Sequence, residues 1–261
     1  MNLNVHARAV YELPADTFLL LMVEPTLFGT RHRVLTESLM TSPTPFSDLW
    51  TDSFGNPQRR MSVPKGQFSF DFRASITVNP DKPIPDWAAE PPPREIPPEA
   101  MVYTLPSRYC QSDRLVRLAQ SEFGQVPPGK RRITAIVEWI RRHVEYRYGT
   151  TNASTSAADT AIERVGVCRD FAHLLIAFCR AIGIPARYVS GYALGLEPPD
   201  FHGYAQVYLG ADWHNVDATY QGVRAALVPI AIGRDAADVA ITTLWGTGTV
   251  LDQSVEVTQA R

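Results

Sequence analysis

Residues 166–191 read GVCRDFAHLLIAFCRAIGIPARYVSG and place a cysteine at the start of an amphipathic helix that leads into a strand. After Cys168 the apolar residues recur every three or four positions, which is the spacing of a helix with one buried stripe. This stripe consists of Phe171, Leu174, Leu175, Phe178, Cys179 and Ile182. Gly183 is a typical helix stop, and Pro185 favours extended chain before it. We therefore predict that Cys168 lies at a helix N-terminus and faces inward.

The predicted position of Cys168 suits a nucleophile. The first N–H groups of a helix have no partner within the helix, and with the helix dipole they stabilise an anion such as a thiolate. The alternative is that Cys168 is a small buried apolar residue, which is the common role of a free cysteine. The residues that follow in the chain favour the nucleophile.

Residues 200–220, DFHGYAQVYLGADWHNVDATY, form two alternating runs around a glycine-containing turn, which predicts a β-hairpin. His202 begins the first run and Asp217 ends the second. A cysteine, a histidine and an aspartate in this arrangement supply a nucleophile, its base and the group that orients the base. We expect the turn to be centred between Leu209 and Gly210, so that His202 and Asp217 stand directly opposite each other on one face.

Together these blocks resemble the motifs of the transglutaminase-like superfamily of papain-type cysteine enzymes, in its bacterial branch described as cysteine proteases. The resemblance covers residues 101–250 and extends more weakly to the N-terminus. It implies a papain-like α+β core in which Cys168 attacks an amide carbonyl, His202 takes and returns the proton, and Asp217 holds the imidazole. The implied activity is hydrolysis of peptide or amide bonds through an acyl-enzyme. Acyl transfer to an amine, and a non-catalytic binding module on the same fold, are the alternatives.

Two positions depart from the pattern of the family. The family commonly has His-Ala-Trp at the base, where this chain has His202-Gly203-Tyr204, and Ala218 follows the aspartate where proline is usual. Neither change alters a side chain of the expected triad. The backbone N–H of Cys168 can serve as one donor to the oxyanion. The second donor, usually a side chain from another segment, is not assigned by the sequence.

The rest of the chain divides into three parts by its composition. Residues 1–78 carry strand patterns and predict an all-β, sandwich-like domain. Residues 79–100 are rich in proline and predict a stiff, extended linker that is not a packed element. Residues 101–261 are expected to form the catalytic domain. Within it, the expected helices are 113–123, 130–146 and 156–165, and the expected closing strands are 227–232 and 254–258.

Composition limits the classes of protein that the chain can represent. With 261 residues and a formal net charge of -2, it lacks the basic excess of a nucleic-acid-binding protein. No signal peptide and no membrane-spanning run is visible, so we expect a cytoplasmic protein without a membrane partner. The three cysteines predict no disulfide framework, and no metal-ligand motif or phosphate-binding loop is present. We expect no metal, no cofactor, and a peptide, protein or amide as substrate, with the oligomeric state left open.

Overall fold

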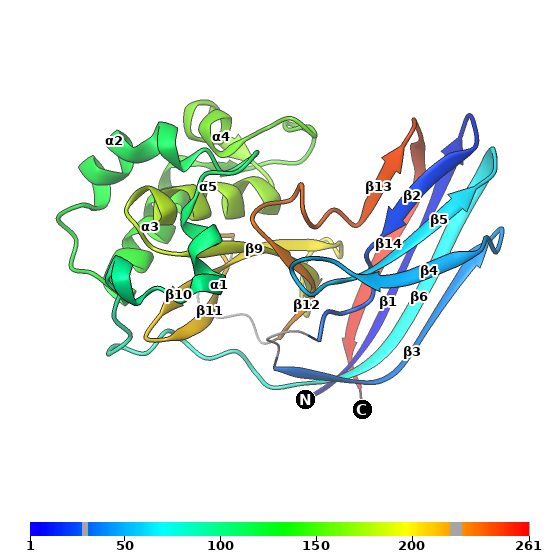
Figure 1. The fold of residues 1–261 in the computed structure, drawn as a ribbon, viewed down its shortest axis with the longest axis horizontal. Coiled ribbons are helices and arrows are strands. Elements are labelled where there is room, and N and C mark those ends of the chain that lie inside the picture. Colours follow the sequence, from blue (N-terminus) through cyan, green and yellow to red (C-terminus); the bar gives the residue numbers. More distant parts are fainter. Residues whose placement is uncertain (28–30, 220–225, 261) are drawn as a thin grey trace.

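Two four-stranded antiparallel sheets form the part of the protein that lies to the right in Figure 1. The computed structural model describes residues 1–27, 31–219 and 226–260. The first sheet has the order β14-β1-β6-β3 and the second β13-β2-β5-β4. Alternate residues of β1 and β6 are buried, because successive side chains of a strand point to opposite faces. The bounds of these strands are β1 (Asn2–Leu13), β2 (Thr17–Leu21), β3 (His32–Ser42), β4 (Ser47–Thr51), β5 (Pro57–Val63), β6 (Gly66–Val78), β13 (Thr242–Trp245) and β14 (Thr249–Gln259).

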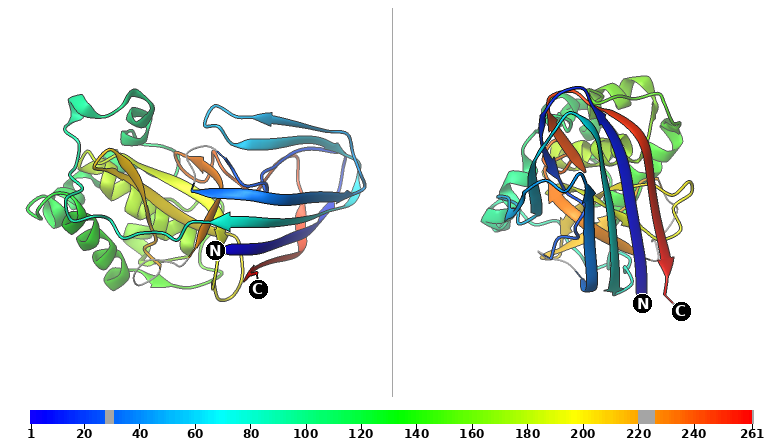
Figure 2. Two further views of the ribbon diagram at one scale, coloured as in Figure 1. Left: turned by 90° about the horizontal axis from the view of Figure 1, so that it is seen from below. Right: turned by 90° about the vertical axis from the view of Figure 1, so that its right-hand side faces the viewer.

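The last two strands of the chain correct the predicted division into domains. β14 pairs with β1 along ten residue pairs, from Leu3 with Gln259 to Glu12 with Thr249, and β13 pairs with β2. The two labelled ends of the chain therefore lie close together (Figure 2). The expected catalytic domain, 101–261, thus contributes strands to both N-terminal sheets. Its residues 220–225 and 261 lie outside the described part of the chain.

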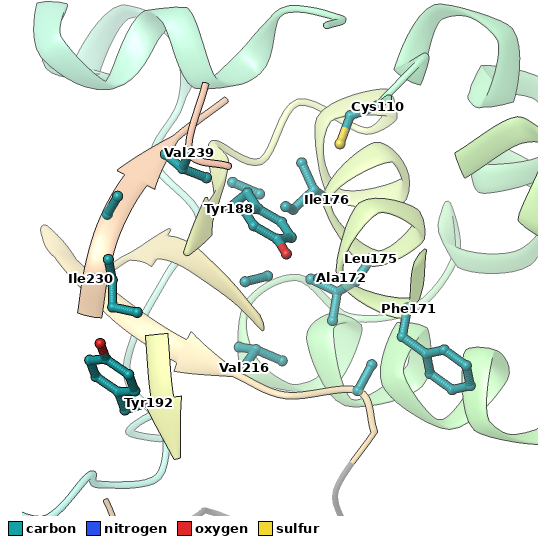
Figure 3. Packing of buried hydrophobic residues seen from close by; sticks show 14 of the residues in the cluster. Cys110, Phe171, Ala172, Leu175, Ile176, Tyr188, Tyr192, Val216, Ile230 and Val239 are labelled. Atoms are coloured by element: carbon teal, nitrogen blue, oxygen red, sulfur yellow. The ribbon is translucent and has the colours of Figure 1, made fainter. Parts of the chain in front are cut away.

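A third antiparallel sheet, β11-β10-β9-β12, carries the helices and the residues of interest. Helix α5 crosses this sheet and is buried along most of its length, with Ala172, Leu175 and Ile176 turned toward Tyr188 (Figure 3). The strands are β9 (Ala186–Ala193), β10 (His202–Leu209), β11 (Asp212–Val216) and β12 (Leu227–Gly233). The helices are α2 (Ser112–Phe123), α3 (Lys130–His143), α4 (Ala157–Glu163) and α5 (Cys168–Ala181). The mixed α+β fold predicted from the sequence is confirmed.

The β10–β11 hairpin has a register that differs from the expected one. Its turn consists of Gly210 and Ala211, both with positive φ (58° and 65°), which is one residue further along the chain than predicted. Such a two-residue turn matches the twist of the strands. Gln206 pairs with Asn215, where the expected register would have given Trp213. A shift of two pairing positions preserves the faces, so His202 and Asp217 stay on the same face but are not direct partners. Tyr220, which ended the segment used for the prediction, lies outside the described residues.

The proline-rich segment is extended as predicted, but it is packed against the helical part. It contains two short helices, η1 (Pro93–Glu95) and α1 (Pro98–Met101), the second followed by η2 (Val102–Thr104). Ala88 is buried, and the backbone oxygen of Ala89 accepts a hydrogen bond from Gly210 N–H at 2.8 Å. Glu90 accepts hydrogen bonds from the Gly129 N–H and from Arg132, both at 2.7 Å. The expectation of an unpacked linker is therefore wrong, because buried contacts hold the segment in place.

Asn56 joins the second N-terminal sheet to the third sheet. Its side-chain amide donates to the backbone oxygen of Ile232 and accepts from the backbone N–H of the same residue, both at 2.8 Å. Asp52 holds Asn56 by accepting from its side-chain amide and from its backbone N–H, each at 2.9 Å. Asn56 is fully buried. One asparagine thus satisfies both backbone groups of Ile232 on β12, as a neighbouring strand would do.

No helix in the described part of the chain is long and apolar enough to cross a membrane.

Candidate active site

Cys168 is the first residue of α5 and differs from the other two cysteines in its accessibility. Cys110 and Cys179 are completely buried, whereas Cys168 is partly exposed. Burial raises the pKa of the Cys110 thiol to about 12, which keeps it protonated at neutral pH. Cys168 lies at the end of the helix where backbone N–H groups have no partner within the helix. It is the one cysteine of the three that a dissolved molecule can reach.

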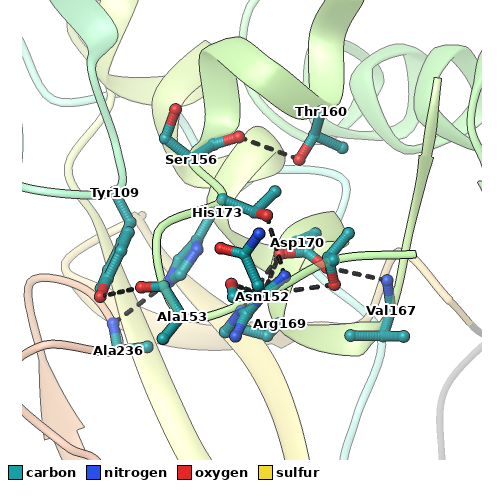
Figure 4. Close-up of polar contacts among 12 residues, drawn as sticks. Tyr109, Asn152, Ala153, Ser156, Thr160, Val167, Arg169, Asp170, His173 and Ala236 are labelled. Carbon is teal, nitrogen blue, oxygen red and sulfur yellow. Dashed lines mark hydrogen bonds and ion pairs between the residues drawn. The ribbon is translucent and has the colours of Figure 1, made fainter. Parts of the chain in front are cut away.

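Asp170 fixes the first turn of α5 (Figure 4). Its carboxylate is fully buried and accepts from the Val167 N–H at 3.0 Å and from the Thr151 hydroxyl at 2.9 Å. Arg169 donates to the same carboxylate at 2.9 and 3.1 Å, and to the backbone oxygen of Asn152 at 2.9 Å. A buried charge that has an ionic partner and several hydrogen bonds holds its surroundings firmly. The orientation of the Cys168 backbone and the loop before α4 therefore depend on Asp170. The sequence pattern does not distinguish Asp170 from an ordinary polar residue of the helix.

His202 and Asp217, the expected base and orienting group, are brought into contact. Nε2 of His202 lies 2.7 Å from Oδ2 of Asp217, and their side chains are 0% and 4% exposed. The other carboxylate oxygen accepts from the Thr219 N–H at 2.9 Å and from its hydroxyl at 2.6 Å. Because the carboxylate is an acceptor, Nε2 carries the hydrogen and Nδ1 is left as the basic nitrogen of the neutral ring.

The surroundings of His202 favour its protonated form. Burial alone would lower its pKa, but the hydrogen bonds and negative charges of Asp217 and Cys168 outweigh burial and raise the pKa to about 9. Nδ1 is buried and has no nitrogen or oxygen partner among the described residues. Since Asp217 takes Nε2, Nδ1 is the nitrogen left to interact with Cys168. An imidazole that lies beside a cysteine sulfur is the base that nucleophilic catalysis by cysteine requires.

Gly203 follows the histidine where the family commonly has alanine, and the structure gives a reason for the change. A Cβ atom at this position would lie 2.2 Å from the hydroxyl oxygen of Tyr188. Tyr188 is 5% exposed, and its ring contacts that of His173 with the centroids 5.0 Å apart. The phenol of Tyr188 thus fills the space that a methyl group would take in the family pattern. Sequence spacing gives no sign of this contact, because the two residues lie on different strands.

Tyr146 borders Cys168 on another side. Strand β7 (Glu145–Tyr146) pairs in parallel with β8 (Val165–Gly166), which places Tyr146 beside Gly166. Its ring lies against Phe171 in the first turn of α5, with the centroids 5.6 Å apart. The helical spacing predicts a helix over 130–146 that would include Tyr146, but α3 ends at His143. The alternating apolar and aromatic residues Val144, Tyr146 and Tyr148 were the signal of extended chain that could have identified it.

Among residues 1–27, 31–219 and 226–260, no three His, Cys, Asp or Glu side chains are arranged to hold a metal ion.

Comparison with known proteins agrees with this geometry. A model of the transglutaminase-like superfamily matches residues 117–218, a span that contains the cysteine, the histidine and the aspartate. The crystal structure of a "putative cysteine protease" from Cytophaga hutchinsonii superposes with a TM-score of 0.91 and 35% sequence identity. The superposition covers 99% of this chain and 90% of that one. It therefore includes the N-terminal sheets as well as the site.

Two mycobacterial relatives match this chain over only a part of their own length. An uncharacterized protein from Mycobacterium leprae is 31% identical over 169 residues, which are 59% of this chain and 59% of that protein. An uncharacterized protein from Mycobacterium tuberculosis is 36% identical over 132 residues, which are 43% of this chain and 42% of that protein. The matches thus extend over about half of the length of these relatives.

Proposed function

Because the chain belongs to the transglutaminase-like superfamily, we propose that it is a cysteine-dependent hydrolase that cleaves peptide or amide bonds through an acyl-enzyme. The observation that carries the proposal is the buried 2.7 Å contact between His202 and Asp217, next to the one partly exposed cysteine. A nucleophile, a base and an orienting carboxylate are the groups that acyl transfer requires. A binding module would have no chemical need for all three.

In the proposed reaction, the Cys168 thiolate attacks the carbonyl carbon of the substrate and forms a carbon–sulfur bond. The electron pair of the carbonyl π bond moves to the oxygen and then returns as the carbon–nitrogen bond breaks. His202, which is protonated at Nδ1, gives this proton to the leaving amine. The neutral imidazole then takes a proton from water as the water attacks the thioester. This second step releases the carboxylic acid and restores the thiolate and the imidazolium.

Asp217 acts on the base and not on the substrate. Its hydrogen bond to Nε2 keeps Nδ1 directed toward the sulfur, and its charge stabilises the imidazolium that both steps use. Thr219 holds the carboxylate by two hydrogen bonds to its other oxygen. The proposed base is therefore fixed in one orientation through a buried chain of contacts.

The proposal is tested by trapping the acyl-enzyme. We expect libraries of peptide and cell-wall amides, and activity-based thiol probes, to yield adducts on Cys168 that mass spectrometry can locate. A Cys168→Ala variant should give no adduct, whereas Cys179→Ala, which changes a buried cysteine, should keep the labelling. Reaction of the intact protein that is not confined to Cys168, or none at all, would contradict the proposal.

The acyl acceptor is determined in the same experiment. Hydrolysis predicts that a labelled primary amine, added with the substrate, is not incorporated into the product at a rate that competes with water. Preferred incorporation of the amine would show transglutaminase activity in place of hydrolysis. A protein with an accessible but unreactive Cys168 would be a binding module.

A further inference from the structure

Acylation of a cysteine places a negative charge on the former carbonyl oxygen, and this oxyanion needs hydrogen-bond donors. The backbone N–H of Cys168 is one such donor, because it belongs to the first turn of α5. A second donor has to be a polar hydrogen close to that N–H and open to the substrate. The residues around Cys168 can be compared on these two conditions.

Most polar groups near Cys168 are occupied or inaccessible. The Tyr188 phenol is 5% exposed and lies against Gly203. The guanidinium of Arg169 is bound to Asp170 and to the Asn152 backbone. His202 is required for the proton that goes to the leaving group. None of these side chains is free to donate to an oxyanion.

Tyr146 meets both conditions. It is 39% exposed, so a substrate can reach its hydroxyl. Its backbone pairs with Gly166, two residues before Cys168, and its ring packs on Phe171, three residues after it. Burial, and after it the negative charge of Cys168, raise the pKa of the phenol, so the hydroxyl lies within electrostatic reach of the sulfur. The phenol therefore borders the first turn of α5, the turn that holds the Cys168 N–H.

The hydrogen of the Tyr146 hydroxyl is available for donation. Among the described residues this hydroxyl donates to the Tyr148 hydroxyl at 3.5 Å, which is longer than a strong O–H···O hydrogen bond. Burial and the negative charge of Cys168 raise the pKa of Tyr146, so the phenol stays protonated through the neutral range. A neutral phenol that is held weakly can turn toward a stronger acceptor.

We propose that the Tyr146 hydroxyl is the second donor of the oxyanion hole, acting beside the backbone N–H of Cys168. This assignment rests on the proposed acyl-enzyme chemistry and adds a catalytic residue to it. When the sulfur attacks, the carbonyl π electrons move onto oxygen, and the oxyanion accepts one hydrogen bond from each donor. When the pair returns to carbon and the leaving group departs, the phenol keeps its proton.

Two reagents distinguish an effect on the oxyanion hole from an effect on the reactivity of the nucleophile. p-Nitrophenyl acetate acylates the thiolate through a tetrahedral oxyanion, whereas iodoacetamide alkylates the same sulfur without forming one. In Tyr146→Phe we expect the acylation rate of Cys168 to fall about 100-fold, which is the usual effect of removing one oxyanion donor. The alkylation rate should stay within about twofold of wild type. Phenylalanine preserves the ring contact with Phe171, so the first turn of α5 is not disturbed.

Tyr148→Phe is the matched control, because it removes the neighbouring hydroxyl and leaves the Tyr146 phenol in place. We expect its loss of acylation rate to be at least tenfold smaller than that of Tyr146→Phe. An unchanged acylation rate in Tyr146→Phe, or equal losses in the two variants, would overturn the assignment. A wild-type protein that iodoacetamide alkylates at Cys168 but the ester does not acylate would overturn the proposed function itself, and the assignment with it.

Discussion

The hydroxyl group of Tyr188 occupies the space in which a side chain at position 203 would begin. An ideal Cβ on Gly203 would lie 2.2 Å from the hydroxyl oxygen and 2.9 Å from Cζ of Tyr188. Tyr188 cannot easily move away, because its ring lies between α5 and the sheet (Figure 3) and contacts the ring of His173. Gly203 follows the proposed base directly in the sequence. The side chain of residue 188 thus limits how closely β10 can approach it, and β10 carries His202.

This limit predicts the behaviour of a Gly203→Ala variant. We expect its free energy of unfolding to fall by about 2 kcal/mol, because overpacking a rigid core has that cost. We also expect iodoacetamide to react more slowly with Cys168 in this variant. Tyr188→Phe removes the closest atom and should recover part of both losses in the double variant. Urea denaturation and iodoacetamide kinetics measure the two effects. A double variant that is as unstable as Gly203→Ala alone would show that the hydroxyl is not the obstacle.

Asp170→Asn should weaken the fold around the nucleophile. The substitution leaves Arg169 without its ionic partner and weakens the hydrogen bonds from Val167 and Thr151. Breaking a buried ion pair from one side typically costs about 3 kcal/mol. Denaturation in urea measures this loss, and Glu163→Gln, at an exposed acidic residue of α4, should change stability by less than about 0.5 kcal/mol. Similar stabilities for the two variants would contradict the function assigned to the buried carboxylate.

The raised pKa of His202 predicts a pH dependence of both stability and reactivity. A histidine with a folded-state pKa of about 9 and an unfolded value of 6.5 stabilises the fold fully below pH 6.5. This contribution is lost as the pH rises through about 9, because the folded state then gives up its extra proton. The rate at which Cys168 is acylated by an amide, with release of the amine, should fall over the same alkaline range, because the amine needs the proton of His202.

Asp217→Asn tests the cause of this pH dependence. The variant lacks the charge and the acceptor that raise the pKa of His202, so the alkaline decline should move to lower pH and turnover should fall about 10⁴-fold. Titration of the His202 ring by NMR measures the shift directly. An unchanged titration midpoint in Asp217→Asn would mean that the carboxylate does not control the imidazole.

Local patterns in the sequence were enough to predict the elements that carry the site. The three-and-four spacing after Cys168 predicted α5, and alternation in the hairpin put His202 and Asp217 on one face. The hairpin register was wrong because the φ > 0 conformation of Ala211 is rare for a residue other than glycine, so the turn was placed too early. The two side chains were still predicted on the correct face, because the error shifts the pairing by two residues and the side chains of a strand alternate between faces with a period of two.

Contacts between distant segments could not be predicted in the same way. Nothing in the pattern of β14 indicates that it pairs with β1 and not with the third sheet, because alternation specifies a face and not a partner. Tyr146 was assigned to a helix because Val144 continues the apolar stripe of α3, although the helix ends before it. The packing of Tyr188 on Gly203 is likewise a property of the assembled sheet. Such features become visible only when the chain is folded.

Asn56 provides a test of how the two parts of the molecule depend on each other. Asn56→Ala removes both hydrogen bonds to Ile232 and leaves a backbone N–H and a backbone oxygen buried without their partners. Each unsatisfied buried group costs about 1–3 kcal/mol, so we expect the two to cost about 2–6 kcal/mol together, in a single unfolding transition. Asn4→Ala is the control, because this exposed asparagine accepts a hydrogen bond from Ser75 at the surface and should change stability by less than about 0.5 kcal/mol. Near-UV circular dichroism and the accessibility of the buried Cys179 should follow the same urea transition in Asn56→Ala. If instead Cys179 becomes accessible at a lower urea concentration than the N-terminal sheets unfold, the two parts unfold separately once the junction is removed, and the expected single transition is wrong.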